Sequence, residues 1–279
     1  MGETEDVPEV DLSQPNAARV YDYMLGGAHN FTVDRAAGDA MLARFPQAAQ
    51  AGHANRDFLR RAVEYCCARG ITQFLDLGSG IPTAGNVHEI VARHHPRARV
   101  AYVDVEPVAV AHSRAVVAEQ ASVTVTQADL RHPEVVLTAP GVRDLLDFDA
   151  PVAVLAVAAL HYVAPDDDLP AVVAGYRAAL APGSALVVSH GSDDVEDAVA
   201  GGHMRELAAV MASSATPAYI RTRAELLEAL AGFELVDPGL VDIRRWRTDT
   251  PDMPDAAVYG AVGLLTVEGG AEPSPASPR

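Results

Sequence analysis

The sequence contains no lysine, and all 21 of its basic residues are arginine. This absence excludes mechanisms that need a lysine amine, such as the Schiff base of pyridoxal-phosphate enzymes and the phosphate-binding lysine of a P-loop. It also excludes the Tyr-Lys pair through which short-chain dehydrogenases move a proton. The chemistry of the chain must therefore rest on other side chains.

Cysteine is nearly absent, because Cys66 and Cys67 are the only two. They are adjacent, so they fit neither a redox or zinc spacing nor a disulfide framework, and we expect them in a helix with at least one in the core. The acidic first 13 residues lack the apolar segment of a signal peptide, and no apolar run is long enough to span a bilayer. We therefore expect a cytoplasmic protein.

Basic charge is also scarce, since 21 basic residues face 38 acidic ones and the net charge is -17. Nucleic-acid binding needs basic surface to neutralise phosphates, so the balance favours a small-molecule ligand. An acidic surface that serves only solubility explains the same charge. With 279 residues, 49% of them apolar, the chain can bury a sizeable core.

The pattern of apolar residues divides the chain into four parts. We expect a mobile acidic N-terminus at 1–14, a helical N-terminal lid at 15–70, a Rossmann-like domain at 71–267 and a disordered tail at 268–279. Within the second part, helices are predicted at 15–27, 34–44 and 47–69. In the third, apolar runs at 71–77, 99–104, 122–126, 151–158 and 184–189 alternate with helical segments, which is typical of an α/β fold with a mostly parallel sheet. The last two runs, FELVDPGLV and AAVYGAVGLLTV, are predicted to pair antiparallel at the sheet edge.

The stretch QFLDLGSGIPTAGN, residues 73–86, predicts a buried strand, a glycine turn and a helix. Ligands of open parallel sheets bind at such strand ends, where Gly78 and Gly80 let the backbone approach closely. Thr83 stands where a dinucleotide fingerprint has its third glycine, which disfavours a pyrophosphate. Asp104 ends the next strand and can accept both hydroxyls of a ribose, while Asp129 ends the third and can meet an adenine edge.

These motifs resemble the class I S-adenosylmethionine-dependent methyltransferases, which carry an acid-x-Gly-x-Gly turn, an acid after the second strand and "ADL" after the third. The resemblance implies a seven-stranded, mostly parallel sheet with helices on both faces. Longer blocks, including ARVYDYMLGGAHNF, FLDLGSGIPTAGNVHEI and LDFDAPVAVLAVAALHYV, are similar to an actinobacterial family of S-adenosylmethionine-dependent methyltransferases. The expected function is methyl transfer from S-adenosylmethionine to an unidentified small molecule.

The resemblance assigns most of the candidate cofactor residues. It implies that the turn Asp76-Leu77-Gly78-Ser79-Gly80 lies against the amino acid end of the cofactor. It places Asp104 and, two residues on, Glu106 at the ribose, and Asp129 with Leu130 at the adenine. The alternative is that Asp104 and Asp129 only cap strand ends.

Two further candidates come from the helical part. In leucine-carboxyl-methyltransferase relatives an arginine placed like Arg56 grips the cofactor carboxylate; a plain surface arginine is the alternative. Tyr21 belongs to the VYDYMLGGAHNF block, which we expect to cover the cofactor or else to pack as an ordinary helix. We assign no role to Asn30 or Asp34.

His161 follows the fourth strand and is the candidate general base, with Tyr162 beside it. A histidine that only shapes the pocket is the alternative. Residues 165–168, PDDD, are predicted to cap a helix, and the remaining histidines have no partner spacing, so we predict no metal site.

Two other functions stay open at this point. One is an NAD(P)-dependent oxidoreductase, against which the glycine spacing and the missing lysine count. The other is an S-adenosylmethionine-binding protein without catalysis, because no catalytic base is certain from the sequence. Neither the methyl acceptor nor the oligomeric state follows from the residues.

Overall fold

The structure is a computed structural model that describes residues 13–82, 85–212, 216–249 and 253–266. Most of the predicted mobile N-terminus (1–14), the whole predicted tail (268–279) and Thr83 lie outside these residues.

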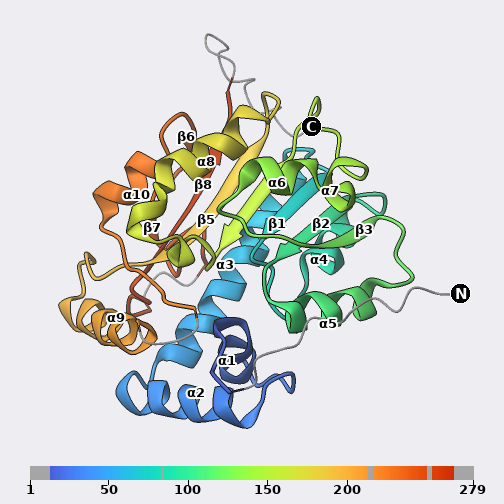
Figure 1. Ribbon diagram of the computed structural model, residues 1–279. Coiled ribbons are helices and arrows are strands. Elements are labelled where there is room, and N and C mark those ends of the chain that lie inside the picture. Colours follow the sequence, from blue (N-terminus) through green and yellow to red (C-terminus); the bar gives the residue numbers. More distant parts are fainter. Residues whose placement is uncertain (1–12, 83–84, 213–215, 250–252, 267–279) are drawn as a thin grey trace, which may run out of the picture.

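An eight-stranded sheet forms the centre of the molecule (Figure 1). Its strands are β1 (Gln73–Leu77), β2 (Arg99–Asp104), β3 (Val123–Gln127), β4 (Ala153–Val157), β5 (Ala185–Gly191), β6 (Glu234–Leu235), β7 (Val241–Asp242) and β8 (Val258–Leu264). They lie in the order β3-β2-β1-β4-β5-β8-β6, and β7 also pairs with β8. The first five strands are parallel, whereas β8 runs antiparallel to β5, β6 and β7.

The predicted mostly parallel sheet with an antiparallel pair at its edge is therefore confirmed. The sheet has eight strands rather than seven because the run FELVDPGLV forms two short strands. Pro238 has no N–H to donate to a neighbouring strand, and Gly239 adopts a φ of +82° in the turn between β6 and β7. The amide of Gly239 donates to the carbonyl of Val236 at 2.7 Å, which closes this turn.

Helices cover both faces of the sheet, and the first three of them precede β1 in the chain. The bounds are α1 (Ala17–Met24), α2 (Thr32–Arg44), α3 (Ala48–Ala68), α4 (Val87–His94), α5 (Pro107–Val117), α6 (Pro133–Thr138), α7 (Pro140–Arg143), α8 (Leu169–Ala178), α9 (Ala198–Met211) and α10 (Arg223–Ala229). Short 3-10 turns lie at Leu160–Tyr162 and Pro165–Asp167. Among the helices of the described residues, none is both long and apolar enough to cross a membrane.

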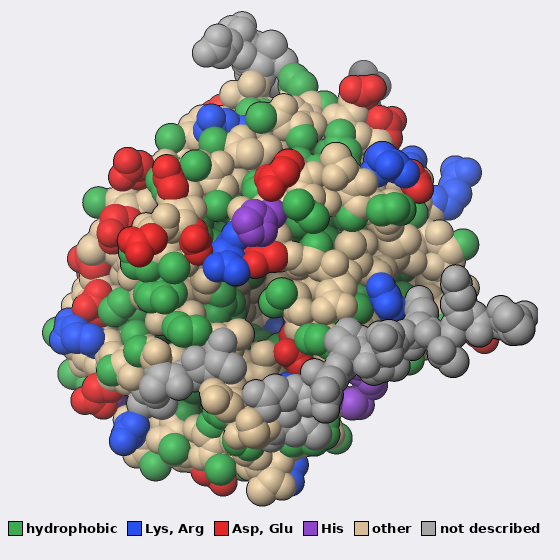
Figure 2. Space-filling model, in the orientation of Figure 1, with side chains coloured by type: hydrophobic (Ala, Val, Ile, Leu, Met, Phe, Trp, Pro, Cys, Tyr) green, Lys and Arg blue, Asp and Glu red, His purple; other side chains and the backbone are tan. Residues whose placement is uncertain are grey.

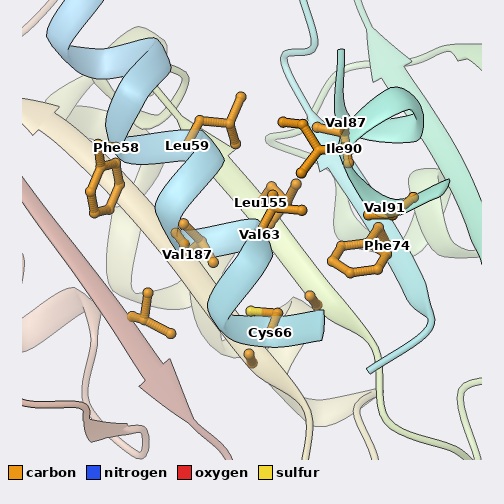
Figure 3. Close-up of a cluster of buried hydrophobic side chains, with 14 of the residues drawn as sticks. Phe58, Leu59, Val63, Cys66, Phe74, Val87, Ile90, Val91, Leu155 and Val187 are labelled. Carbon is orange, nitrogen blue, oxygen red and sulfur yellow. The ribbon is translucent and has the colours of Figure 1, made fainter. Parts of the chain in front are cut away.

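The strands are apolar on both faces because two separate cores pack against them. One core contains Phe74 and Leu155 from the strands, with side chains of α3 and α4 (Figure 3). The other contains Leu75 and Val154, which are sequence neighbours of Phe74 and Leu155, with side chains of α6, α7, α8 and α10. This alternation follows from the two-residue repeat of a strand and explains why the runs lack polar positions.

The first three helices, α1 to α3, agree with the helices predicted at 15–27, 34–44 and 47–69 to within a few residues. Both cysteines lie buried in α3, as expected. Asp168 caps α8 by accepting a hydrogen bond from the amide of Ala171, which confirms the capping role predicted for the PDDD run.

A buried ion-pair network ties the N-terminal helices to the sheet. Arg19 of α1 donates from Nε to Asp34 of α2 at 2.9 Å, and from Nη1 to Glu106 after β2 at 3.0 Å. Only 2% of the Arg19 side chain is exposed, so these two carboxylates, rather than water, stabilise its positive charge. Asn16, the N-cap of α1, adds a 2.8 Å hydrogen bond to Glu106.

Replacing Arg19 tests how much this network stabilises the fold. Arg19→Ala leaves two buried carboxylates without their cation, so we expect it to lower the free energy of unfolding by about 3–5 kcal/mol. The control is Arg60→Ala, which breaks an exposed i,i+4 pair with Glu64 and should cost about 0.5 kcal/mol or less. Urea unfolding measures both, and equal losses would contradict a structural role for Arg19.

Candidate functional site

A cavity of about 510 Å³ lies along the carboxyl ends of the parallel strands. Among the described residues, those at the ends of β3, β2, β1, β4, β5 and β8, or just beyond them, line the cavity, so it crosses most of the sheet edge. Helices α1, α2, α3 and α9 close it on the other sides. Figure 1 shows α1 and α2 beyond one end of the sheet, with α3 running from them along the sheet. The volume of the cavity falls within the usual range of small-molecule sites.

The glycine turn after β1 forms one wall of the cavity. Gly78 and Gly80 have φ values of +68° and +66°, in the left-handed region that favours glycine. A Cβ on Gly78 would lie 2.8 Å from the Cβ of Ala159, so no larger residue fits there. The Ser79 hydroxyl is buried and has no hydrogen-bond partner among the described residues, which leaves a polar atom available to a ligand.

Asp104 joins the end of β2 to this turn. Its Oδ2 accepts from the Gly80 amide at 2.7 Å, and its Oδ1 accepts from the Glu106 amide at 2.9 Å. Burial raises the pKa of the carboxyl, and the two amide hydrogen bonds oppose that rise. The carboxylate is thus fixed at the edge of the cavity, where sequence reasoning placed it.

Asp76 and Arg56 put opposite charges on the same wall. Asp76 is buried at the end of β1, and burial raises its pKa to about 7, although the Arg56 guanidinium opposes the shift. Arg56 of α3 donates from Nη2 to the carbonyl of Gly85 beyond the glycine turn, at 2.9 Å. The sequence predicted Arg56 for the site, and the structure places it on the cavity wall.

Asp129 and Leu130 line the cavity at the end of β3. Arg131 donates to the Asp129 carboxylate from its backbone amide, Nε and Nη2, and from Nη1 to Asp167 across the loop at 3.1 Å. Burial raises the pKa of Asp129, but the Arg131 hydrogen bonds outweigh it and leave the pKa below its usual value. Sequence reasoning missed this pairing.

Glu106 also lines the cavity, but its carboxylate is held by Arg19 and Asn16. Neither of these partners was predicted for the site. The contacts join positions 87 and 90 residues apart, and nothing in the pattern around α1 marks Arg19 as buried.

His161 and Tyr162 lie on the cavity wall after β4, with ring centroids 4.4 Å apart. Burial, together with the nearby His190 and Arg221, lowers the pKa of His161 to about 3. The imidazole is therefore neutral at every pH near physiological.

Tyr21 of α1 belongs to a hydrogen-bonded run inside the cavity wall. Its hydroxyl donates to the carbonyl of Gly52 at 3.1 Å and accepts from Asn55 at 3.3 Å. Asn55 in turn accepts from the Ser189 hydroxyl at 2.6 Å, which ties α3 to β5. Tyr23, two residues on, instead donates to Asp39 at the surface.

Helix α9 supplies the side of the cavity that sequence reasoning missed. Met204, Leu207, Ala208 and Met211 face it. Its sequence, AVAGGHMRELAAVM, carries no chemical motif, so only the folded arrangement reveals its place at the cavity.

Gly78→Ala tests how closely the turn approaches β4. The matched control is Gly70→Ala, which has a similar φ of +83° but no atom within 4 Å of the added Cβ. Both changes meet the left-handed backbone penalty, while only Gly78→Ala meets Ala159. We expect Gly78→Ala to lower the free energy of unfolding by about 1–3 kcal/mol more than the control. Denaturant titration measures the difference, and a difference of zero would show that the approach is loose.

Comparison with known proteins agrees with this geometry. The model of the S-adenosyl methyltransferase family matches residues 3–266. A candidate methyltransferase from Thermobifida fusca YX is 37% identical, with a TM-score of 0.87 over 95% of this chain and 100% of that one. A DUF574 family protein from Streptomyces avermitilis MA-4680 is 36% identical, with a TM-score of 0.85 over 91% and 98%. No curated protein matches. The predicted class I methyltransferase fold is confirmed, and the chain belongs to the S-adenosyl methyltransferase family.

Proposed function

We propose that the chain binds S-adenosylmethionine over the ends of β1, β2 and β3 and methylates a small molecule held in the rest of the same cavity. The family match makes the chain an S-adenosylmethionine-dependent methyltransferase and does not favour the oxidoreductase alternative. The observation that supports the finer proposal is that the glycine turn, the strand-end acids and His161 all line one cavity.

The residues present fit this cofactor. The turn presents the left-handed backbone of Gly78 and Gly80 to the cavity, and the buried Ser79 hydroxyl between them has no partner among the described residues. S-adenosylmethionine, when bound, supplies a methyl group activated by a sulfonium, so the protein has mainly to align the acceptor and exclude water.

We assign Asp104 to the ribose, because a fixed carboxylate can accept hydrogen bonds from two hydroxyls. Glu106 lies beside it, and its contacts with Arg19 and Asn16 suit it to hold α1 over the ribose end. Leu130 and Asp129 are assigned to the adenine, with Arg131 fixing the carboxylate.

The amino acid end of the cofactor carries an ammonium and a carboxylate. Asp76 and Arg56 offer the complementary pair of charges beside Gly78 and Gly80. A guanidinium can hold a carboxylate through two hydrogen bonds, which favours Arg56 for that group and Asp76 for the ammonium.

His161 is proposed to face the acceptor. As a neutral imidazole, it has a ring nitrogen that can accept a hydrogen bond from an acceptor hydroxyl or amine. Its low pKa makes it a weak base, so we propose that it orients the acceptor and receives its proton only as the nucleophile loses it. Tyr21 and Tyr162 also line the cavity and help to shape it.

We further propose a cytoplasmic protein of an actinobacterial branch of the family that does not act on nucleic acid. Both cysteines are free, which suits a reducing compartment. The net charge is -17, and Figure 2 shows acidic side chains gathered over α10, which would repel phosphates. We also propose that the helices at 15–70 act as a lid on the 71–267 domain.

Calorimetric titration with S-adenosylmethionine, S-adenosylhomocysteine and NAD tests the proposed function. We expect the first two to bind with a Kd on the order of micromolar, and Asp104→Ala to weaken both by about a hundredfold because the ribose loses its acceptor and the turn its anchor. NAD should not bind. Binding of NAD alone would contradict the proposal.

Arg56→Ala tests the carboxylate contact. We expect it to weaken S-adenosylhomocysteine binding by about tenfold or more, because a charge-assisted pair is lost. Arg60→Ala, one turn along α3 and exposed, is the control and should leave the Kd unchanged. Equal affinities in the two variants would remove Arg56 from the site.

The pH dependence of binding tests Asp76. Its carboxyl is protonated below about pH 7 in the free protein, and a cofactor ammonium favours the charged form. Affinity for S-adenosylhomocysteine should therefore rise by about tenfold between pH 5.5 and 7, as binding releases a proton at the lower pH. The isosteric Asp76→Asn should not show this rise. A wild-type profile as flat as that of the variant would place the ammonium elsewhere.

A further inference from the structure

We infer that the methyl acceptor is an uncharged, largely apolar small molecule. This inference rests on the proposed function and concerns the half of the cavity lined by the ends of β4, β5 and β8, by the N-terminal helices and by α9, which we call the acceptor half. It commits to the chemical class of the acceptor, which neither the family match nor the similar structures indicate.

The first observation is the distribution of charge along the sheet edge. Six charged residues line the cavity in the described parts of the chain, and five of them lie at the ends of β1 and β2 or just after β2 and β3. The sixth, Arg56, acts electrostatically on both Asp76 and Tyr21, but its guanidinium donates to the carbonyl of Gly85 beyond the glycine turn, which places it on the side of the cofactor turn. The strand order places β4, β5 and β8 on the other side of β1, so the charges gather at one end of the cavity.

The second observation is the lining of the acceptor half. Four of the chain's six methionines line the cavity: Met24, Met41, Met204 and Met211. Met204 packs beside the end of β5, since a Cβ on Gly191 would lie 2.9 Å from its sulfur. Phe45 and Leu207 add further apolar surface. Methionine side chains are flexible and polarizable, so they adapt to an apolar ligand of irregular outline.

The third observation is that the polar groups of this half are already occupied or neutral. Asn55 uses its amide between Tyr21 and Ser189, and the Tyr21 hydroxyl donates to Gly52. His161 is neutral because burial holds its pKa low. The charge of Arg221 reaches His161, but Arg221 does not line the cavity, and its guanidinium donates to the carbonyls of Leu160 and Val163. A charged acceptor would therefore lose its hydration here without contacting a counter-charge on the lining, at a cost of several kcal/mol. A neutral molecule with one hydroxyl or amine, directed at His161, meets no such cost.

The experiment compares two fluorescent probes that share a phenyl-naphthylamine frame, on the full chain saturated with S-adenosylhomocysteine. N-phenyl-1-naphthylamine is uncharged, and 8-anilino-1-naphthalenesulfonate carries a sulfonate. We expect the uncharged probe to bind about tenfold more tightly or better, because the sulfonate meets no cation. Equal or tighter binding of the sulfonate would overturn the inference, and this comparison needs no variant.

A pair of neighbouring variants locates the probe. Ala208 lines the cavity, whereas Ala209 is exposed. Ala208→Trp should fill the acceptor half and weaken the uncharged probe by about tenfold or more, and Ala209→Trp should change its Kd by no more than about twofold. Retained S-adenosylhomocysteine binding in both variants shows that they are folded. Unchanged probe binding in Ala208→Trp would overturn the inference. If the wild type binds the uncharged probe but does not bind S-adenosylhomocysteine, that result contradicts the proposed function instead.

Discussion

The hydrogen bonds accepted by Asp104 are the interaction on which the site depends. One carboxylate oxygen holds the Gly80 amide of the glycine turn, and the other holds the Glu106 amide beyond β2. The Glu106 side chain accepts a hydrogen bond from Arg19, and Arg19 also donates to Asp34. A single run of charge-assisted hydrogen bonds thus links the glycine turn to α1 and α2, and such bonds are stronger than neutral ones.

Under the proposed function, this arrangement also explains how one cavity serves two unlike molecules. The acids that anchor the turn and the N-terminal helices stand at the ends of β1 and β2, so the polar requirements of the fold and of the cofactor are met in the same place. The other half of the cavity is closed by apolar side chains of α1, α2 and α9, which bury surface against one another, and no charged side chain of the described residues lines that half. Water exclusion and apolar selectivity follow from the same packing.

The sequence was most informative where a residue pattern has only one common structural explanation. Continuous apolar runs predicted the parallel strands, because both faces of the sheet are covered. Acids directly after strands predicted Asp104 and Asp129 at the cavity, because the carboxyl ends of parallel strands meet at one edge. Pro238 and Gly239 are turn-forming residues from which the division of the predicted sixth strand could have been expected. The apolar residues on both sides of them instead suggested one continuous strand.

The rest could not be predicted because it depends on contacts between distant segments. Arg19 lies in an ordinary-looking helix, and only its encounter with Glu106, 87 residues away, makes it a buried ion-pair partner. The Ala-rich and Gly-rich α9 lies at the cavity because the chain returns there after β5. The partner of Asp129 is instead a near neighbour, Arg131, and its residue type alone does not show whether the guanidinium turns back to the carboxylate or points into solvent.

The central claim is that the cavity has a charged cofactor half and an uncharged acceptor half. A crystal structure of the chain with S-adenosylhomocysteine tests it most directly. The account predicts that the ligand lies over β1, β2 and β3 with its ribose at Asp104, leaving the space beside Met204 and Ala208 open. A ligand seated among the methionines, away from the glycine turn, would contradict it.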